Sequence, residues 1–198
     1  MKETEHLSLR EAIAEVLERA ITEMNDKSVE LVKVNKDGNV RIPLYFVDES
    51  GRSASYCNVD LLIIKDDKIR VIFEVEEGGI DPIRICGTYL MSSFSQFHIH
   101  NEEDQGRRIP MDPNATFIQI INAPTPIVTR IDKAGQLENI KKMITSNPIK
   151  NSNITDYELL TGTSTEFKKD DRELLSVVKK ALANPEKQGV ERKGKQDE

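Results

Sequence analysis

The segment NVDLLIIKDDKIRVIFEVEEGG (58–79) is the best-formed hairpin in the sequence, and it places strong limits on the fold. Two apolar runs of strand length stand on either side of a polar turn at 65–68, a pattern that predicts antiparallel pairing. Each strand nevertheless carries acidic residues. Asp60 opens the first run, and Glu74 and Glu76 close the second at alternate positions, so their side chains share one face of the strand.

The other apolar runs extend this hairpin into a larger sheet. The dipeptide Asp-Gly within NKDGN (35–39) predicts a hairpin before it. A later run, TFIQIINA, is too apolar for a strand exposed on both faces and is expected inside the sheet. The predicted strands form an antiparallel meander and one further strand, at 29–34, 40–47, 55–65, 69–77 and 116–123. The polar segment 98–113 is expected to be a loop.

Four segments are predicted to be helices, because apolar residues recur in them at helical spacing. The first carries a capping box formed by Ser8 and Glu11, and Asp81 with Pro82 suits the start of the second. Gly87 within the second helix predicts the close approach of another element. The second helix repeats Ile83, Cys86, Leu90, Phe94 and Phe97. The predicted helices cover about 7–24, 82–97, 131–144 and 170–183.

Length and composition indicate one soluble domain. A chain of 198 residues with 37% hydrophobic and 31% charged residues can bury a real core. We expect a single domain over 1–183, with a core at about 7–123 and a C-terminal helical part at about 130–183. The charged segment 184–198, which is almost free of large apolar groups, is expected to be a disordered tail.

Several function classes are disfavoured by what the sequence contains. No apolar run is long enough for a membrane span, and no secretory pattern opens the chain, so a cytoplasmic location without a membrane partner is expected. Cys57 and Cys86 are too few for a disulfide framework and too far apart for a CxxC motif. The net charge of −6 argues against a protein that coats DNA with its whole surface.

The three acids of the hairpin predict a cation site if Asp60 faces the same way as Glu74 and Glu76. Their repulsion would be unfavourable unless a positive group lay between them. Mg²⁺ prefers oxygen ligands and can activate water at neutral pH. Ordinary solvated acids at strand ends are the alternative.

The order strand, short turn, strand, acids, Gly-Gly and helix resembles the PD-(D/E)XK nuclease superfamily over about residues 7–123. Asp60 in VDLLII matches the family's aspartate, and Glu74 in FEVEE matches its (D/E)-x-K motif. Glu76 stands where the family has lysine, as in a variant with Glu-x-Glu. The resemblance implies an α/β, restriction-endonuclease-like sandwich, in which helices flank a central mixed sheet made of the antiparallel meander and the further strand.

The resemblance also implies a function and a set of site residues. It implies an endonuclease of the restriction, resolvase or repair type that hydrolyses DNA, with Mg²⁺ or Mn²⁺ as cofactor and a homodimer as the common assembly. Asp60 and Glu74 would hold the metal ion, and Glu76 would serve as base or as a further ligand. The family often adds a glutamate from the first helix, for which Glu18 is the expected residue and Glu15 the alternative.

Arginines are expected to hold the phosphates of DNA, and those nearest the motif in sequence are Arg84, Arg107 and Arg108. Two other functions remain open. The missing lysine is also compatible with a catalytically inactive protein of the same fold that serves as a DNA-binding or protein-interaction subunit. An unrelated α/β protein with acids at its strand ends is the third interpretation.

Overall fold

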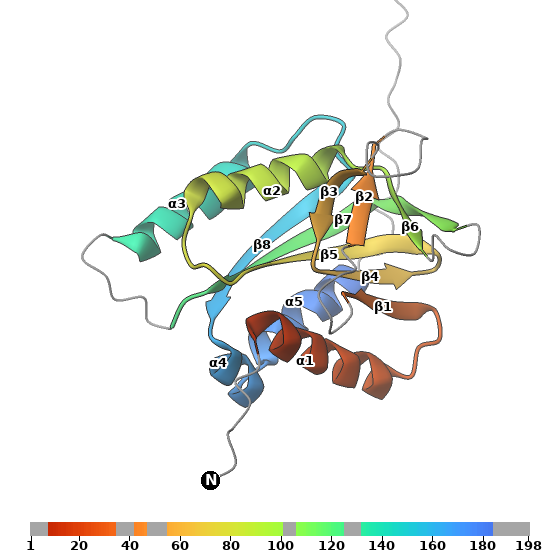
Figure 1. Cartoon of the computed structure of the whole chain (residues 1–198), viewed down its shortest axis with the longest axis horizontal. Coiled ribbons are helices and arrows are strands. Elements are labelled where there is room, and N and C mark those ends of the chain that lie inside the picture. Colours follow the sequence, from red (N-terminus) through yellow and green to blue (C-terminus); the bar gives the residue numbers. More distant parts are fainter. Residues whose placement is uncertain (1–7, 35–41, 47–54, 101–105, 125–131, 184–198) are drawn as a thin grey trace, which may run out of the picture.

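The computed structural model describes residues 8–34, 42–46, 55–100, 106–124 and 132–183. Within these ranges the chain forms an α/β structure with a mixed sheet of eight strands and five helices (Figure 1). The helices are α1 (Leu9–Met24), α2 (Pro82–Phe94), α3 (Lys133–Ser146), α4 (Ser164–Lys169) and α5 (Arg172–Ala183). The strands are β1 (Val29–Lys33), β2 (Ile42–Tyr45), β3 (Ser55–Val59), β4 (Leu61–Lys65), β5 (Lys68–Glu76), β6 (Phe97–His100), β7 (Arg107–Asn122) and β8 (Ile154–Gly162). The predicted NKDGN turn and the tail 184–198 lie outside the described residues.

Helices α1 and α2 start where their caps predict. The Ser8 hydroxyl accepts a hydrogen bond from the Glu11 backbone N–H, and the Glu11 carboxylate accepts one from the Ser8 backbone N–H. This confirms the capping box of α1. The Asp81 carboxylate caps α2 by accepting from the backbone N–H groups of Ile83 and Arg84. The caps therefore fix the position of both helix starts.

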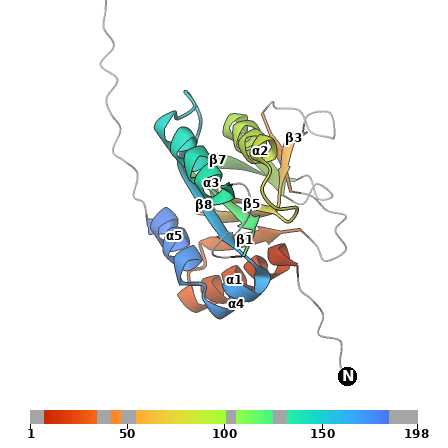
Figure 2. The same ribbon diagram turned by 90° about the vertical axis from the view of Figure 1, so that its left-hand side faces the viewer.

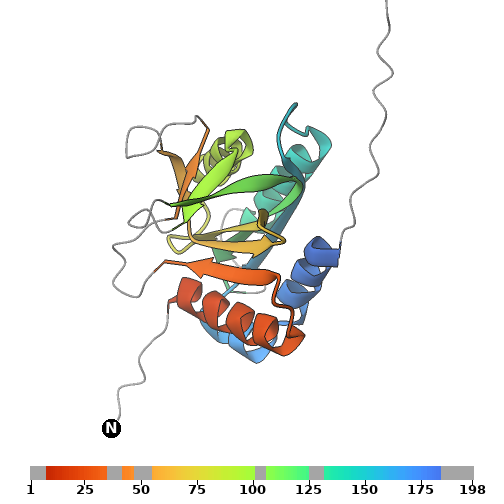
Figure 3. The same cartoon turned by 90° about the vertical axis from the view of Figure 1, so that its right-hand side faces the viewer.

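The hairpin β4–β5 is confirmed and lies inside the sheet. It is antiparallel with Leu61 opposite Phe73, and the other edge of β5 pairs in parallel with β7. Strand β8 extends the sheet beyond β7, again in parallel. The amino-terminal part of β7 pairs antiparallel with β6, which continues through β2 to β3. Figure 3 shows this progression from orange β1 through the yellow hairpin to the green strands.

The predicted meander is wrong at its first hairpin. Strand β1 pairs with β4, and β2 pairs instead with β3 and β6. The predicted strand 55–65 is also divided at Asp60, where the chain bends from β3 into β4. Because of this bend, the first half of the segment pairs with β2 as β3, and the second half pairs with β1 and β5 as β4.

Helices cover both faces of the sheet, which gives the three-layer arrangement in Figures 1 and 2. Helices α2 and α3 pack on one face, with Ile85, Tyr89 and Ile140 among their buried residues. Helices α1, α4 and α5 pack on the other, where Leu17 and Leu174 are fully buried. No helix in the described residues is long and apolar enough to cross a membrane.

Three further expectations differ from the structure. The segment 98–113 is not a loop throughout, because it contains most of β6 and the start of β7. Strand β8 and helix α4 have no counterpart among the predicted elements. In α2 the apolar repeat of Ile83, Leu90 and Phe94 is exposed, and the opposite side of the helix is buried.

Arg70 occupies a bulge in β5, and the bulge turns its side chain to the face of the sheet opposite to the one that simple alternation predicts. Alternation alone would place Arg70 on the face of Glu74 and Glu76, but the register shifts between Ile69 and Val71. The Arg70 Nε–H donates instead to the carbonyl of Ala181 in α5, and its Nη1 lies 2.7 Å from Asp112 Oδ1. Arg70 therefore compensates a buried carboxylate at the other end of β5.

We expect Arg70→Ala to lower the free energy of unfolding by about 3–5 kcal/mol, because Asp112 would remain as an uncompensated, largely buried charge. Arg172 is the matched control, since its ion pair with Asp170 lies in solvent. Arg172→Ala is expected to leave the urea midpoint almost unchanged. Urea unfolding followed by circular dichroism measures both variants, and equal losses would contradict this role of Arg70.

Candidate functional site

Two glutamates are buried at the carboxyl end of β5. Val71, Phe73 and Val75 point toward α1 and α5, so the alternate residues Glu74 and Glu76 face the side of α2 and α3. The exposed fraction is 8% for Glu74 and 1% for Glu76. Charged carboxylates are rarely buried to this extent unless they are paired or bind a cation.

Asp60 reaches the same place from the bend between β3 and β4. Its Oδ2 accepts a hydrogen bond of 2.8 Å from the backbone N–H of Val75, the residue between the two glutamates. Its own backbone N–H donates to the carbonyl of Phe73. Both bonds fix the Asp60 carboxylate against the end of β5. The structure thus brings together Asp60, Glu74 and Glu76, which we call the acid cluster.

Two arginines supply positive charge at the edge of the acid cluster. Arg84, in the first turn of α2, places its Nε 2.7 Å from Glu76 Oε2. Arg10, in the first turn of α1, places its Nη1 3.3 Å from Asp60 Oδ1. Both guanidinium groups are substantially exposed, so solvent screens them and they compensate the buried carboxylates only in part.

Burial raises the pKa of Glu74 to about 9, and the negative charges of Asp60 and Glu76 add to this effect. The positive charges of Arg84 and Arg10 act in the opposite direction but are weaker. Without a further cation, Glu74 is therefore protonated at neutral pH. The cluster holds a carboxyl group that would ionise if positive charge were added beside it.

Glu76 has one oxygen without a partner. Burial raises the pKa of Glu76, while Arg84 opposes the rise through its contact with Oε2. The other oxygen, Oε1, is buried and accepts no hydrogen bond from the part of the chain that the structure describes. Because a buried unpaired acceptor is destabilising by about 1–3 kcal/mol, such an atom indicates a missing ligand or water.

A buried polar network adjoins the cluster, and it involves residues that were not predicted from the sequence. Gln119 of β7 is the register partner of Glu74 and is fully buried. Its Nε2–H donates to the Thr88 hydroxyl of α2, and its Oε1 accepts from the Tyr157 hydroxyl of β8. The one signal in the sequence was a glutamine within the apolar run TFIQIINA. The network fixes α2, and with it Arg84, relative to β5.

The donor set suits a cation that takes few protein ligands. Among the residues that the structure describes, no three His, Cys, Asp or Glu side chains are grouped closely enough to hold one metal ion together. Mg²⁺ commonly takes only one or two carboxylates and completes its shell with water and phosphate. The unpaired oxygen of Glu76 and the protonated Glu74 fit such an ion.

The structure does not bring a glutamate of α1 to the cluster. Glu18 pairs with Lys33 of β1, and Glu15 lies 3.1 Å from Lys168 of α4. Arg10 is the α1 residue at the cluster, and Glu18 lies eight positions further, or about 12 Å along the helix axis. The first helix therefore contributes a positive charge where a carboxylate was expected.

Of the three predicted phosphate-binding arginines, only Arg84 lies at the cluster. Arg107 and Arg108 begin β7, which runs parallel to β5, so they lie at the opposite end of the sheet from Glu76. Arg107 pairs there with Glu30 and Asp67, and Arg108 stacks on the ring of Phe97. These contacts explain both arginines without a nucleic acid.

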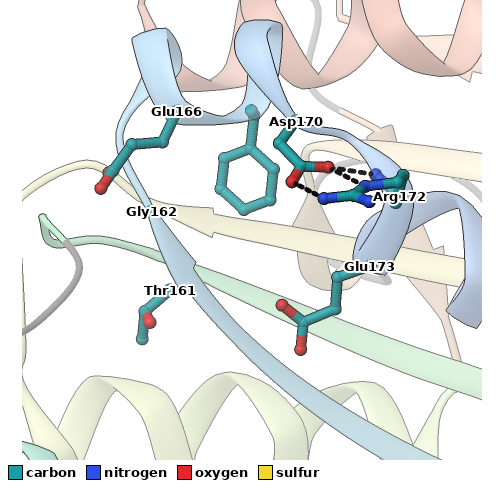
Figure 4. A pocket seen from close by; sticks show the side chains of 7 residues that line it. Thr161, Gly162, Glu166, Asp170, Arg172 and Glu173 are labelled. Carbon is teal, nitrogen blue, oxygen red and sulfur yellow. Dashed lines mark hydrogen bonds and ion pairs between the residues drawn. The ribbon is translucent and has the colours of Figure 1, made fainter.

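A separate pocket of about 550 Å³ opens at the carboxyl end of β8 (Figure 4). The pocket is lined by Thr161, Phe167 and the ion pair of Asp170 and Arg172. Glu166 also lines it, and its carboxylate accepts hydrogen bonds from Thr163. None of the residues of the acid cluster lines this pocket. Asp170 and Arg172 pair with each other and the Glu166 carboxylate caps α4, whereas the acid cluster combines burial with an unpaired oxygen, so we place the candidate site at β5.

We expect Glu74→Gln to stabilise the protein at pH 8 in the absence of divalent cations. The folded-state pKa of Glu74, about 9, lies above its ordinary value of 4.5. The folded state therefore binds more protons between these two pH values, and stability falls as the pH rises through this window. Glutamine removes this loss, and the melting temperature should rise by roughly 3–10 °C.

Thermal unfolding between pH 5 and pH 9 measures this effect. The melting temperature of Glu74→Gln should depend less on pH than that of the wild type, whereas Glu138→Gln, at an exposed position of α3, should keep the wild-type slope. A Glu74→Gln variant with the wild-type slope would show that Glu74 does not gain a proton on folding.

Comparisons with protein-family models, with curated proteins and with solved structures gave no match for this chain. The function of the protein is therefore inferred from the acid cluster itself. Its chemistry is that of buried carboxylates beside two exposed guanidinium groups, at the end of a central strand. Such a cluster can take up a divalent cation and present an anionic substrate to it.

Proposed function

We propose that this protein is a divalent-metal-dependent endonuclease that hydrolyses DNA phosphodiester bonds. The observation that carries the proposal is the buried pair Glu74 and Glu76. Glu74 gains a proton, and Oε1 of Glu76 accepts no hydrogen bond from the described residues. Both features would be relieved by one divalent cation bound next to Asp60. Mg²⁺ or Mn²⁺ is the proposed cofactor.

The order of elements around the cluster supports a restriction-endonuclease-like fold of the PD-(D/E)XK type. Helix α1 is followed by β1, β4 and β5, which are antiparallel neighbours, and then by α2 and the parallel strand β7. This agrees with the helix, three-stranded meander, helix and further strand of that family. Strands β2 and β3 are then an insertion between the first two core strands.

The proposed roles follow from the contacts of each side chain. Asp60 and Glu74 would hold the cation, since Asp60 is fixed by Val75 and Glu74 needs positive charge to ionise. A bound Mg²⁺ would polarise the phosphodiester and the attacking water. Glu76 would accept the proton of that water at Oε1, the oxygen without a partner.

Arg84 would take over part of the role of the missing family lysine. Its Nε contacts Glu76 Oε2, and more than half of its side chain is exposed to an approaching phosphate. It can therefore hold Glu76 in place and donate to a phosphate oxygen from the rest of its guanidinium fork. In a chain with a net charge of −6, this contact and the cation would be the main attraction for DNA.

The inactive alternative has one observation in its favour. Arg10 and Arg84 already lie beside Asp60 and Glu76, so the chain supplies part of the positive charge that a metal ion would bring. A protein in which these arginines replaced the cation would keep the fold and could serve as a DNA-binding or protein-interaction subunit. Metal binding separates the two functions.

We expect Mn²⁺ to bind the wild-type protein at one site in calorimetric titrations, and Asp60→Ala to weaken this binding at least roughly 10-fold. Plasmid cleavage in Mg²⁺ should fall by about 100-fold or more in Asp60→Ala and Glu74→Ala, because each removes charge that stabilises the transition state. Glu138→Ala on the surface of α3 is the control. Wild-type protein that binds no Mn²⁺ would favour the inactive alternative, and equal cleavage by wild type and Asp60→Ala would exclude the proposed site.

Arg84→Ala should lower cleavage while leaving Mn²⁺ binding within about threefold of the wild type, because Arg84 contacts Glu76 and not the two proposed metal ligands. Since Arg84 lowers the pKa of Glu76, its removal should also move the acidic limb of the pH–rate profile to higher pH. Lys142→Ala on α3 is the control and should change neither the cleavage rate nor its pH dependence. An unshifted profile would mean that Arg84 does not act through Glu76.

A further inference from the structure

The outer side of α2 exposes an apolar stripe. Ile83, Leu90 and Phe94 are 85%, 45% and 38% exposed, and Gly87 lies between them on the same side of the helix. At 3.6 residues per turn these four positions fall within an arc of about 60°. Helix α2 belongs to the outermost layer of the fold in Figures 1 and 2. We call Ile83, Gly87, Leu90 and Phe94 the α2 stripe.

Packing within the chain does not account for Gly87. A glycine within a helix is destabilising by about 1 kcal/mol relative to alanine. Among the residues that the structure describes, and apart from the local backbone of α2, no atom lies within 4 Å of a Cβ at this position, so no described element of the chain requires the glycine. The close approach that the sequence predicts at Gly87 is therefore not made within the described chain, and the position is open to a helix of a second molecule.

The spacing of the α2 stripe is self-complementary. The midpoint of the stripe lies between Thr88 and Tyr89. Gly87 and Leu90 lie at equal distances on either side of it, and Ile83 and Phe94 lie at equal, larger distances. In an antiparallel pair of α2 helices about a two-fold axis, Leu90 of each copy would face Gly87 of the other. Ile83 would likewise face Phe94. A large residue opposite a glycine gives the close helix contact that such an interface needs.

The charge of the α2 stripe also suits a second copy of this chain. Each chain has a net charge of −6, so two copies repel unless they meet through a neutral surface. No Asp, Glu, Lys or Arg occurs from Ile85 to Phe97, in a chain in which 31% of residues are charged. Two antiparallel α2 helices would therefore meet without opposing charges of the same sign in their central turns.

The exposed apolar side chains near α2 supply only part of the area of a stable interface. A stable interface buries about 800 Å² on each partner, and the exposed apolar side chains of the α2 stripe supply less than half of this. The other large exposed apolar residues of the described chain are Phe46, which follows β2, and Met143 of α3. Helix α3 contacts α2, and β2 pairs with β3, which also contacts α2. If all five side chains took part, they would offer roughly 500 Å² per chain, and polar residues at the rim would have to supply the remaining area.

We propose that α2 is the interface of a homodimer in which two copies pack antiparallel about a two-fold axis, with Gly87 of each chain against Leu90 of the other. The interface does not depend on the nuclease activity. It would place the Glu76–Arg84 contacts of the two chains near opposite ends of the helix pair. Since the apolar area lies below that of a standard interface, we expect a weak dimer and test it at micromolar concentrations.

Sedimentation equilibrium between 1 and 200 µM tests the proposal on the full chain. The wild type should dimerise, and Ile83→Lys or Phe94→Glu should weaken the dimer at least roughly 50-fold, since each buries a charge against an apolar side chain. The double variant Ile83→Lys/Phe94→Glu should recover the dimer, because each lysine would face a glutamate. The matched double variant Ile83→Lys/Phe94→Lys should stay monomeric.

Gly87→Gln provides a second test, because it should weaken the dimer and stabilise the monomer. It should abolish the dimer by filling the space for Leu90, yet raise the melting temperature of the dilute monomer, because glutamine favours a helix more than glycine does. Lys179→Glu on α5 is the control and should change neither. A monomeric wild type at 200 µM, a dimer insensitive to these substitutions, or equal dissociation of the two double variants would each overturn the proposal.

Discussion

The pairing of β5 along both of its edges is the constraint on which the candidate site depends. Strand β5 bonds to β4 and β7, and helices cover the sheet above and below it, so its carboxyl end is buried. Glu74 and Glu76 at the end of an edge strand would be solvated acids with ordinary pKa values. In their present place, water stabilises their charge only weakly, and the nearby charges of Arg84 and Arg10 offset the effect of burial only in part. The sheet topology thus determines the chemistry of the cluster.

Features that depend on local interactions were predictable from the sequence, and pairing between distant segments was not. The hairpin β4–β5 and the caps Ser8 and Asp81 involve residues close in sequence, and all three are confirmed. The pairing of β1 with β4 depends on β2 and β3 pairing at the far end of the sheet, next to β6, which no short-range pattern records. The buried side of α2 was also unpredictable, because its small serines and Tyr89 are less hydrophobic than the exposed Ile83 and Leu90.

The site could be predicted in part for the same reason. Alternation along one strand placed Glu74 beside Glu76, and the short turn placed Asp60 near them. Alternation failed for Arg70 because a bulge adds one residue and reverses the direction of its side chain. Arg10 could not be predicted, since its contact with Asp60 depends on how α1 lies across the sheet.

Helix α2 links these features, because different sides of one short helix make different contacts. Its first turn carries Arg84 to Glu76, and on its inner side the Thr88 hydroxyl accepts a hydrogen bond from the Gln119 side-chain amide. Its outer side carries Gly87 and Leu90. A partner bound along the outer side would therefore restrict the same rigid element that positions Arg84. Because the helix is anchored to the sheet next to Glu74, pairing of two α2 helices would fix the separation of two acid clusters. That separation would in turn limit which two phosphates of a nucleic acid could be reached at once.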